Sequence, residues 1–262
     1  MGKEPITTMP RIFVTNDDGV HAPGLFALVE AMRTLGEVTV VGPAINQSAS
    51  GHKKTLHTDI PVQRTTLRDG TPALAVSGSP ADTISLLSLN FYAQWPPDIV
   101  VSGINRGANL GQDVTYSGTV TAALEAAMNG VAAVAVSLDN RDADQVEDYK
   151  LAAEVAVMVV GRALEKRMPP LTILNVNIPY GDSVKGIRLT RQGVRVYLDE
   201  LYVNEDQSIA RIVGPAPTGK FDIEGTDVWA LNEGYASLTP LHLDLTAHQF
   251  LAELAAWDID RK

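Results

Sequence analysis

The sequence predicts an α/β protein with a Rossmann-like, mostly parallel sheet flanked by helices and a C-terminal antiparallel β extension. In the first two-thirds of the chain, short apolar runs rich in β-branched residues alternate with amphipathic stretches, which is the pattern of a parallel sheet covered by helices. After about residue 177, strand-like runs follow one another without a helical pattern between them. The chain has 262 residues, 45% of them hydrophobic, which is enough for one large core with an appended region.

The alternating part defines the elements of the expected core. Strands are expected where an apolar run ends in a polar or glycine-containing turn, at residues 11–15, 38–41, 73–76, 99–101, 131–136 and 172–176. Helices are expected at residues 23–35, 80–89, 118–128 and 147–166. The last helix has the clearest pattern, because Leu151, Val155, Met158, Val159 and Arg162 follow the spacing of one helical face.

The later part of the chain predicts the β extension. Strands are expected at residues 187–190, 194–203, 209–213 and 226–231, followed by a terminal helix at 247–256. We therefore expect an N-terminal extension over residues 1–10, an α/β core over 11–180, and a β-rich projecting region with a C-terminal helix over 181–262. Such an extension either packs on its own core or reaches a second subunit, and we expect it to serve oligomerisation.

Composition excludes several classes of function. The chain carries 21 Lys+Arg against 31 Asp+Glu, a net charge of −10, which argues against DNA or an anionic membrane as a partner. It has no cysteine, so disulfides, thiolate zinc sites and a cysteine nucleophile are excluded. No apolar run resembles a signal peptide or is long enough to span a bilayer, so we expect a cytoplasmic protein.

Polar residues follow the expected strands at four junctions, and ligands of open α/β sheets bind at the carboxyl ends of the strands. At the first junction, Asp17 and Asp18 precede Gly19. Two close carboxylates repel each other, and a bound cation such as Mg²⁺ or Mn²⁺, which prefers oxygen ligands, relieves that repulsion. The alternative is that one of these residues merely caps the following helix. The sequence leaves both interpretations open.

The second junction is rich in serine and glycine and includes Ser48, Ser50 and Gly51. On its own, such a segment is most simply an ordinary loop. Beside an acidic pair, Ser48 would supply a neutral oxygen ligand, and the N–H groups and hydroxyl around Ser50 and Gly51 would hold a phosphate.

The third junction combines glycines with short polar side chains. Its glycines permit close approach of a ligand, Asn105 and Asn109 supply amide groups, and Ser117, Gly118 and Thr119 form a helix N-terminus suited to an anion. The spacing matches neither the Walker motif nor the dinucleotide-binding fingerprint. The alternative is a glycine-rich linker in which Ser117 simply caps a helix.

The fourth junction is a strand-to-helix turn, with Pro80 suited to a first helical position. For Asp82, compensation of the helix dipole is the favoured interpretation. Gly78 and Ser79 are candidate substrate contacts.

Together these motifs are more specific than any one of them. TNDDG with HAPG, QSASGHKKTL, SGSPAD and SGINRGANLGQDVTYSGTVTAALEA resemble the SurE family of metal-dependent nucleotide phosphatases, in order over residues 11–179. TPLHLDLT at residues 239–246 resembles the closing motif of that family. The resemblance implies a Rossmann-like core with a projecting β region, and hydrolysis of nucleoside 5′-monophosphates to nucleoside and phosphate. It also implies a broader tolerance for 3′-monophosphates and short polyphosphate.

The resemblance further implies one divalent ion per subunit, Mg²⁺ or Mn²⁺, with Asp17, Asp18, Ser48 and Asn105 as ligands. It implies a homodimer or homotetramer. Thr83 stands where many relatives have cysteine, at a position that is not a ligand, and residues 191–220 are harder to match.

The residues and the resemblance converge on the hydrolysis of a phosphate monoester as a hypothesis. Asp17, Asp18 and Asn105 are the expected catalytic residues. The expected phosphate-binding residues are Ser50, Gly51, Gly78, Asn109, Ser117, Gly118 and Thr119. Either a metal-activated water attacks phosphorus, with a carboxylate accepting its proton, or an aspartate attacks directly.

Two alternative functions remain beside this hypothesis. A nucleotide-binding stress protein without catalysis would use the same pocket, although an acidic pair does not help a site that only binds anions. A dehalogenase-like phosphatase would use an aspartate nucleophile, but that chemistry uses a D-x-D spacing and this pair is contiguous.

Overall fold

The structure is a computed structural model that describes residues 9–215, 217–257 and 259 of the chain. The N-terminal extension expected over residues 1–10 therefore lies almost wholly outside the described residues. No helix in the described ranges combines the length and the hydropathy needed to cross a membrane.

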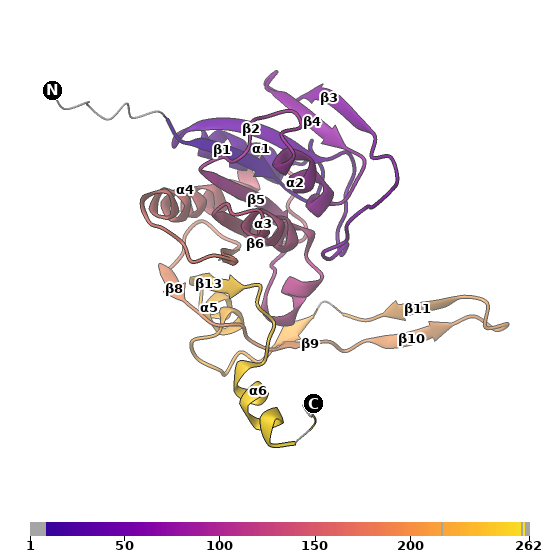
Figure 1. The fold of residues 1–262 in the computed structure, drawn as a ribbon. Coiled ribbons are helices and arrows are strands. Elements are labelled where there is room, and N and C mark those ends of the chain that lie inside the picture. The colour runs from indigo at the N-terminus through magenta and orange to yellow at the C-terminus, as the bar shows by residue number, and fades with distance from the viewer. Residues whose placement is uncertain (1–8, 216, 258, 260–262) are drawn as a thin grey trace.

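Six parallel strands form the centre of the sheet, as predicted. They are β1 (Arg11–Thr15), β2 (Glu37–Pro43), β4 (Pro72–Val76), β5 (Ile99–Arg106), β6 (Ala133–Asp139) and β7 (Thr172–Pro179). Three further strands extend the sheet: β3 (Val62–Thr66), β8 (Ile187–Leu189) and β13 (Ala236–His242). The resulting nine-stranded sheet has the order β3-β4-β2-β1-β5-β6-β7-β13-β8, with β3 antiparallel to β4 and β13 antiparallel to β7 (Figure 1).

Helices cover both faces of this sheet. Two of them, α1 (Pro23–Met32) and α4 (Lys150–Glu165), pack on one face, and α2 (Pro80–Ser88) and α3 (Gly118–Met128) pack on the other (Figure 1). Successive side chains of a strand point to opposite faces. Accordingly, Ile12 belongs to the hydrophobic cluster beneath α1 and α4, and its neighbour Phe13 belongs to the cluster beneath α2 and α3.

The position of β1 creates a topological switch point. The chain continues from β1 through α1 to β2 on one side, and later places β5 on the other side of β1. The loops that follow β1 and β5 therefore diverge, which leaves a crevice at their carboxyl ends. The first, second and third polar junctions of the sequence open at this crevice.

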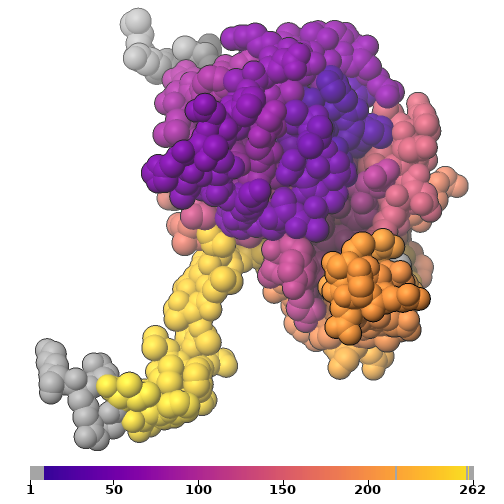
Figure 2. Space-filling view, turned by 90° about the vertical axis from the view of Figure 1, so that its right-hand side faces the viewer, coloured from indigo at the N-terminus to yellow at the C-terminus, as the bar shows by residue number. Residues whose placement is uncertain are grey.

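The C-terminal part projects from this body. A hairpin of β10 (Glu200–Val203) and β11 (Ala210–Val213) extends outward beyond β9 (Arg195–Val196), to the right in Figure 1. β9 itself pairs with β12 (Thr218–Gly219) in a small sheet. In Figure 2 this hairpin points toward the viewer, and the arm that carries α6 (His248–Leu254) descends from the body.

Two expectations for this part were wrong. Residues 226–231 were expected as a strand but form α5 (Asp227–Asn232), which begins where the Thr226 side chain accepts a hydrogen bond from the N–H of Trp229. The short apolar pattern fits a helix as well as a strand, and the Thr226 cap decides between them. The strand expected at 194–203 is divided into β9 and β10, because its two parts pair with different strands, β12 and β11.

Candidate active site

The carboxyl ends of three neighbouring strands meet at one pocket. Asp17 follows β1, Ser48 lies beyond β2, and Asn105 lies at the end of β5, and all three line a pocket of about 620 Å³. Three of the four predicted ligands, which are far apart in sequence, thus line one pocket at the switch point. Asp18 lines a neighbouring pocket with Asn46 and Arg106, and Arg106 borders both pockets.

Asp17 is the most buried member of the acidic pair, with only 3% of its surface exposed. The hydroxyl of Thr119 donates a hydrogen bond to its Oδ1. A Cβ atom at Gly118 would lie 2.7 Å from the Asp17 Cβ, so glycine at this position lets α3 approach the carboxylate. The pKa of Asp17 is raised to about 6, mainly because the carboxyl group is buried; the Thr119 hydrogen bond opposes the increase, and the nearby charge of Asp18 adds to it.

Asp18 is less buried and receives two hydrogen bonds. Its Oδ2 accepts one from the N–H of Arg106 at 3.0 Å, and its Oδ1 accepts one from Asn46 Nδ2 at 3.3 Å. Burial raises the pKa of Asp18, and Arg106 opposes the increase. The residue that caps α1 is Ala22, whose side chain makes no capping hydrogen bond. The capping interpretation of the acidic pair is therefore excluded.

The donor atoms fit a hard divalent cation. Asn105 Nδ2 donates to the carbonyl of Gly107 at 2.7 Å, so the amide Oδ1 is the atom that can serve as a ligand. With Ser48 Oγ and the two aspartates, the candidate ligands are all oxygens, which suits Mg²⁺ or Mn²⁺. Within the described residues, no salt bridge joins Asp17 or Asp18 to a basic side chain. A cation would therefore compensate buried negative charge that the chain leaves unpaired.

In the loop around Ser50, a hydroxyl group is available to bind a phosphate, and the backbone N–H groups of Ser50 and Gly51 are not. Ser50 N donates to the carbonyl of Gln47 at 3.1 Å, and Gly51 N donates to that of Tyr116 at 3.0 Å. These bonds occupy the N–H groups that the sequence assigned to phosphate. Ser50 Oγ is buried and has no hydrogen-bond partner among the described residues. The structure thus narrows the phosphate-binding role of this loop to one hydroxyl.

The N-terminus of α3 also faces the pocket. Ser117 lines the pocket, and its Oγ accepts a hydrogen bond from Val120 N at 3.1 Å, so it is also the helix cap. Its two interpretations are compatible, because a capped helix start still presents N–H groups and a positive dipole end to an anion.

Asn109 is held rigidly at the pocket by the ends of β6 and β7. Its N–H donates to Asn177 Oδ1 at 2.7 Å, and its Nδ2 donates to Ser137 Oγ at 2.8 Å. Its carbonyl accepts from Nδ2 of both Asn175 and Asn177. These buried amides fix the loop that follows β5 and keep Asn109 in the pocket wall.

The fourth junction is structural in this fold. Ser79 and Asp82 form a reciprocal capping box at the start of α2, which confirms the favoured interpretation of Asp82. Ser79 Oγ donates to the carbonyl of Lys53 at 2.5 Å, and a Cβ at Gly78 would lie 2.9 Å from the Asp82 carboxylate. Neither Gly78 nor Ser79 is among the described residues that line the pocket. The structure therefore does not place them where they would contact substrate.

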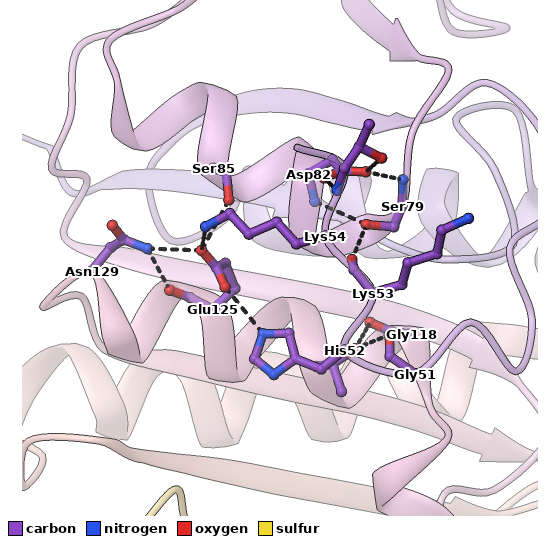
Figure 3. Close-up of polar contacts among 12 residues, drawn as sticks. Gly51, His52, Lys53, Lys54, Ser79, Asp82, Ser85, Gly118, Glu125 and Asn129 are labelled. Carbon is purple, nitrogen blue, oxygen red and sulfur yellow. Dashed lines mark hydrogen bonds and ion pairs between the residues drawn. The ribbon is translucent and has the colours of Figure 1, made fainter. Parts of the chain in front are cut away.

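A strap of residues 51–55 follows the Ser48–Ser50 loop and lies across α2 and α3 (Figure 3). Glu125, 3% exposed, holds it: His52 Nε2 and Lys54 Nζ each lie 3.0 Å from a Glu125 carboxylate oxygen, and Ser85 Oγ donates at 2.9 Å. Burial raises the pKa of Glu125, but these three contacts outweigh it and lower the pKa to about 2. The Asp82 carboxylate accepts hydrogen bonds from Thr55 N and Oγ1 at 2.7 and 2.8 Å.

Sequence reasoning missed several residues that line the pocket. Arg141 follows β6 at the same edge of the sheet, so its position after a strand was a usable signal. Arg106 and Tyr116 lie inside the same motif as Asn105, Asn109 and Ser117. Tyr197 had no signal, because it lies in the stretch that was hardest to match.

Fold and site together define an α/β protein with an acidic, oxygen-rich pocket at the switch point of its sheet. The family model described as Survival protein SurE matches residues 12–199. A 5′-nucleotidase SurE of Syntrophotalea carbinolica is 45% identical, over 95% of this chain and 97% of its own. One from Chloroflexus aggregans is 46% identical, over 94% and 98%. The crystal structure of the SurE protein from Aquifex aeolicus covers 95% of this chain and 99% of its own, with a TM-score of 0.80 and 36% identity. The chain belongs to the SurE family.

Proposed function

We propose that this chain is a divalent-metal-dependent phosphatase that hydrolyses nucleoside 5′-monophosphates to nucleoside and phosphate. The observation that carries the proposal is the pair of the buried Asp17 and the partly buried Asp18. Neither has a basic side-chain partner in the described residues, and Asp17 lies beside the N-terminus of α3. Relatives that match nearly the whole chain bear the name 5′-nucleotidase. We include 3′-monophosphates and short polyphosphate as further substrates to be tested.

Asp17, Asp18, Ser48 and Asn105 would hold one Mg²⁺ or Mn²⁺ ion. When bound, such an ion neutralises the charge of the phosphate and polarises its oxygens. This supports catalysis by a chain with a net charge of −10, since a phosphate dianion would otherwise be repelled by the acidic pair.

The side chains of this chain would orient the phosphate and move a proton. The N-terminus of α3 and Ser50 Oγ supply a positive dipole end and a donor to the phosphoryl oxygens, while Asn109 shapes the wall opposite. A carboxylate oxygen of Asp17 or Asp18 accepts the proton of an attacking water. Direct attack on phosphorus by one of the two aspartates is the alternative route.

Labelled water and trapping of the acyl phosphate together separate these two routes. In a single turnover in H₂¹⁸O, attack by water places ¹⁸O in the released phosphate. An aspartyl phosphate that water opens at its carbonyl carbon leaves ¹⁸O in the carboxyl group and yields phosphate without label, whereas one that water opens at phosphorus yields labelled phosphate and is detected by trapping with hydroxylamine. Label-free phosphate would therefore reject the route through water.

The test of the function is phosphate release from a panel of nucleoside monophosphates, with Mg²⁺, with Mn²⁺ and with EDTA. Wild type should release phosphate only with metal, and Asp18→Asn, which removes charge at nearly constant volume, should keep the fold and lose most of the activity. Asp222→Asn serves as the matched control, because Asp222 is exposed and is not among the residues that line the pocket. Folded wild type that binds nucleotide but releases no phosphate under any condition would replace the proposal with a nucleotide-binding stress protein.

We also propose a homodimer or homotetramer assembled through the projecting region. The hairpin exposes Leu201 and Ile212 to 71% and 75%, and α6 exposes Phe250 and Leu251. Exposed apolar residues on projecting elements are typical of subunit contacts. Analytical ultracentrifugation of wild type and of Leu201→Asp with Ile212→Asp tests this, and a wild-type monomer would reject it.

A further inference from the structure

Two tyrosine residues line the same pocket as Asp17. Tyr116 and Tyr197 come from different parts of the chain, yet both border the pocket of about 620 Å³ that contains Asp17, Ser48 and Asn105. Their side chains remain 62% and 45% exposed. Among the described residues that line this pocket, they are the aromatic ones. Both rings are therefore available to contact the organic part of a phosphate ester substrate.

Asp113 anchors both tyrosines. The Tyr197 hydroxyl donates a hydrogen bond to Asp113 Oδ1, and Arg195 Nε donates to Oδ2 at 3.0 Å. The backbone N–H of Tyr116 donates to the Asp113 carbonyl at 2.9 Å. Asp113 and Arg195 are themselves nearly buried, with 13% and 10% of their side chains exposed. This arrangement ties the turn before α3 to the segment that leads into the projecting hairpin.

The Tyr197 ring is thereby fixed while its face remains accessible. Its hydroxyl is held by Asp113, and Arg195 N donates to Gln112 Oε1 at 2.9 Å, so the chain on the N-terminal side of Tyr197 is held as well. Burial and Asp113 raise the pKa of Tyr197 to about 12, so the hydroxyl keeps the proton that this bond requires. A ring held at its edge loses little entropy when a flat partner packs against its face.

Tyr116 connects this wall to the phosphate side of the pocket. It directly precedes Ser117, the cap of α3, and its carbonyl accepts the hydrogen bond from Gly51 N at 3.0 Å. A group joined to a phosphate at the α3 N-terminus therefore lies within reach of this ring. Asp199 also lines the pocket and has no salt bridge among the described residues, so its charge makes the side of the pocket near Tyr197 unfavourable for a phosphate. The charges thus favour one orientation, with the phosphate toward α3 and the uncharged part toward the tyrosines.

We propose that Tyr116 and Tyr197 form the nucleoside-binding wall of this pocket and hold the base of the substrate by stacking. The inference rests on the proposed function and deepens it. Every base has an aromatic face, so stacking accepts all bases and favours purines, which offer the larger face. The wall thus gives the enzyme a preference for nucleotides over phosphate esters without a base.

The test compares AMP with ribose 5-phosphate, which differs in lacking the base. Tyr197→Ala should lower kcat/KM for AMP about tenfold more than for ribose 5-phosphate, mainly through KM, because a stacked base contributes about 1–3 kcal/mol. Tyr197→Phe keeps the ring and should retain most of the preference. Tyr116→Ala should act in the same direction as Tyr197→Ala. Tyr180→Ala is the control, since Tyr180 is 59% exposed and outside the pocket lining.

Adenosine binding, measured by calorimetry, provides a readout that does not depend on turnover. Affinity should fall about tenfold in Tyr197→Ala and stay unchanged in Tyr180→Ala. Equal losses of kcat/KM for AMP and ribose 5-phosphate, or undiminished adenosine binding in Tyr197→Ala, would overturn the inference. If wild type hydrolyses neither ester, the proposed function fails, and the adenosine measurement still decides whether the wall exists.

Discussion

Asp17 and Glu125 are two buried carboxylates that lie against or on α3, and each is only 3% exposed. They differ in their partners, because Glu125 has basic side chains beside it and Asp17 has none. Asp17 contacts the first residues of α3 and receives a side-chain hydrogen bond from Thr119. Glu125, in a later turn of α3, faces His52, Lys54 and Ser85. Burial raises the pKa of both groups, but only at Glu125 do the partners reverse the effect.

The difference separates a site from a structural contact. A buried carboxylate without a cation costs stability, and a fold keeps one where a ligand supplies the missing charge. A buried carboxylate with a basic partner and several donors holds two parts of the chain together. The strap held by Glu125 continues directly from the loop that carries Ser48 and Ser50. The contacts of Glu125 therefore help to position one side of the candidate metal site at Asp17.

The largest expected effect is the loss of activity when Asp17, the buried carboxylate without a basic partner, is replaced. Asp17→Asn should lower kcat for nucleoside monophosphate hydrolysis about a hundredfold or more, because it removes a charged oxygen at the candidate metal site. Isothermal titration should show weaker Mn²⁺ binding by the same variant, while circular dichroism stays that of wild type. If Asp17→Asn kept the wild-type kcat at saturating Mn²⁺, Asp17 would not be a functional carboxylate and would not differ from Glu125 in this respect.

The next effect concerns the free energy of unfolding when Glu125, the buried carboxylate with basic partners, is replaced. Glu125→Ala should lower the free energy of unfolding by about 3 kcal/mol, because Lys54 and His52 lose their buried partner and Ser85 loses an acceptor. Urea unfolding measures this change.

The matched control is Glu165→Gln, which breaks an exposed ion pair with Arg162 and should cost less than about 0.5 kcal/mol. Equal losses in Glu125→Ala and the control would show that the strap contact is no stronger than a surface pair. The Glu125→Ala protein that remains folded should also bind Mn²⁺ more weakly, since the loop bearing Ser48 loses its anchor.

Local patterns explain what the sequence could predict. The apolar run of β1 and the polar residues directly after it are contiguous, so both the strand and the location of Asp17 and Asp18 follow from a short stretch. The same holds for β5 and Asn105, and the rule that ligands bind at the carboxyl ends of parallel strands joined these stretches in space. Short elements were less certain, because the few apolar residues of α5 fit both periodicities.

Contacts between distant residues explain what the sequence could not predict. Lys54 lies 71 positions from Glu125, and nothing near Lys54 indicates that it pairs with a buried acid rather than facing solvent. Tyr197 lies 84 positions from Asp113, and only the folded chain places it in the pocket. For Ser50 and Gly51, the sequence predicted proximity to the site, but which N–H groups remain available depends on partners in the folded loop.

A third effect is the acid dependence of stability. The pKa of Glu125 falls from 4.5 to about 2 on folding, so the unfolded chain takes up this proton more readily. The resulting contribution is fully present above pH 4.5 and is lost as the pH falls toward 2, and about 2 kcal/mol of it is lost between pH 7 and pH 3. Unfolding of wild type and Glu125→Gln, measured at several pH values from 7 to 3, should show the difference between them shrinking with acid. A difference that stays constant with pH would mean that packing, not charge, holds the strap.

The smallest effect has the opposite sign and concerns Asp17 in the absence of metal. Its pKa is raised from 3.8 to about 6, so between these values the folded chain holds the proton more tightly, and stability falls as the pH rises. At pH 7.5 the ionised, buried carboxylate therefore destabilises the metal-free protein. Asp17→Asn removes that charge and should raise the free energy of unfolding in EDTA by about 1 kcal/mol, since the amide can still accept from Thr119. Adding Mn²⁺ should reverse the order, because wild type gains more from the ion. A metal-free variant less stable than wild type would place Asp17 with Glu125 as a structural residue.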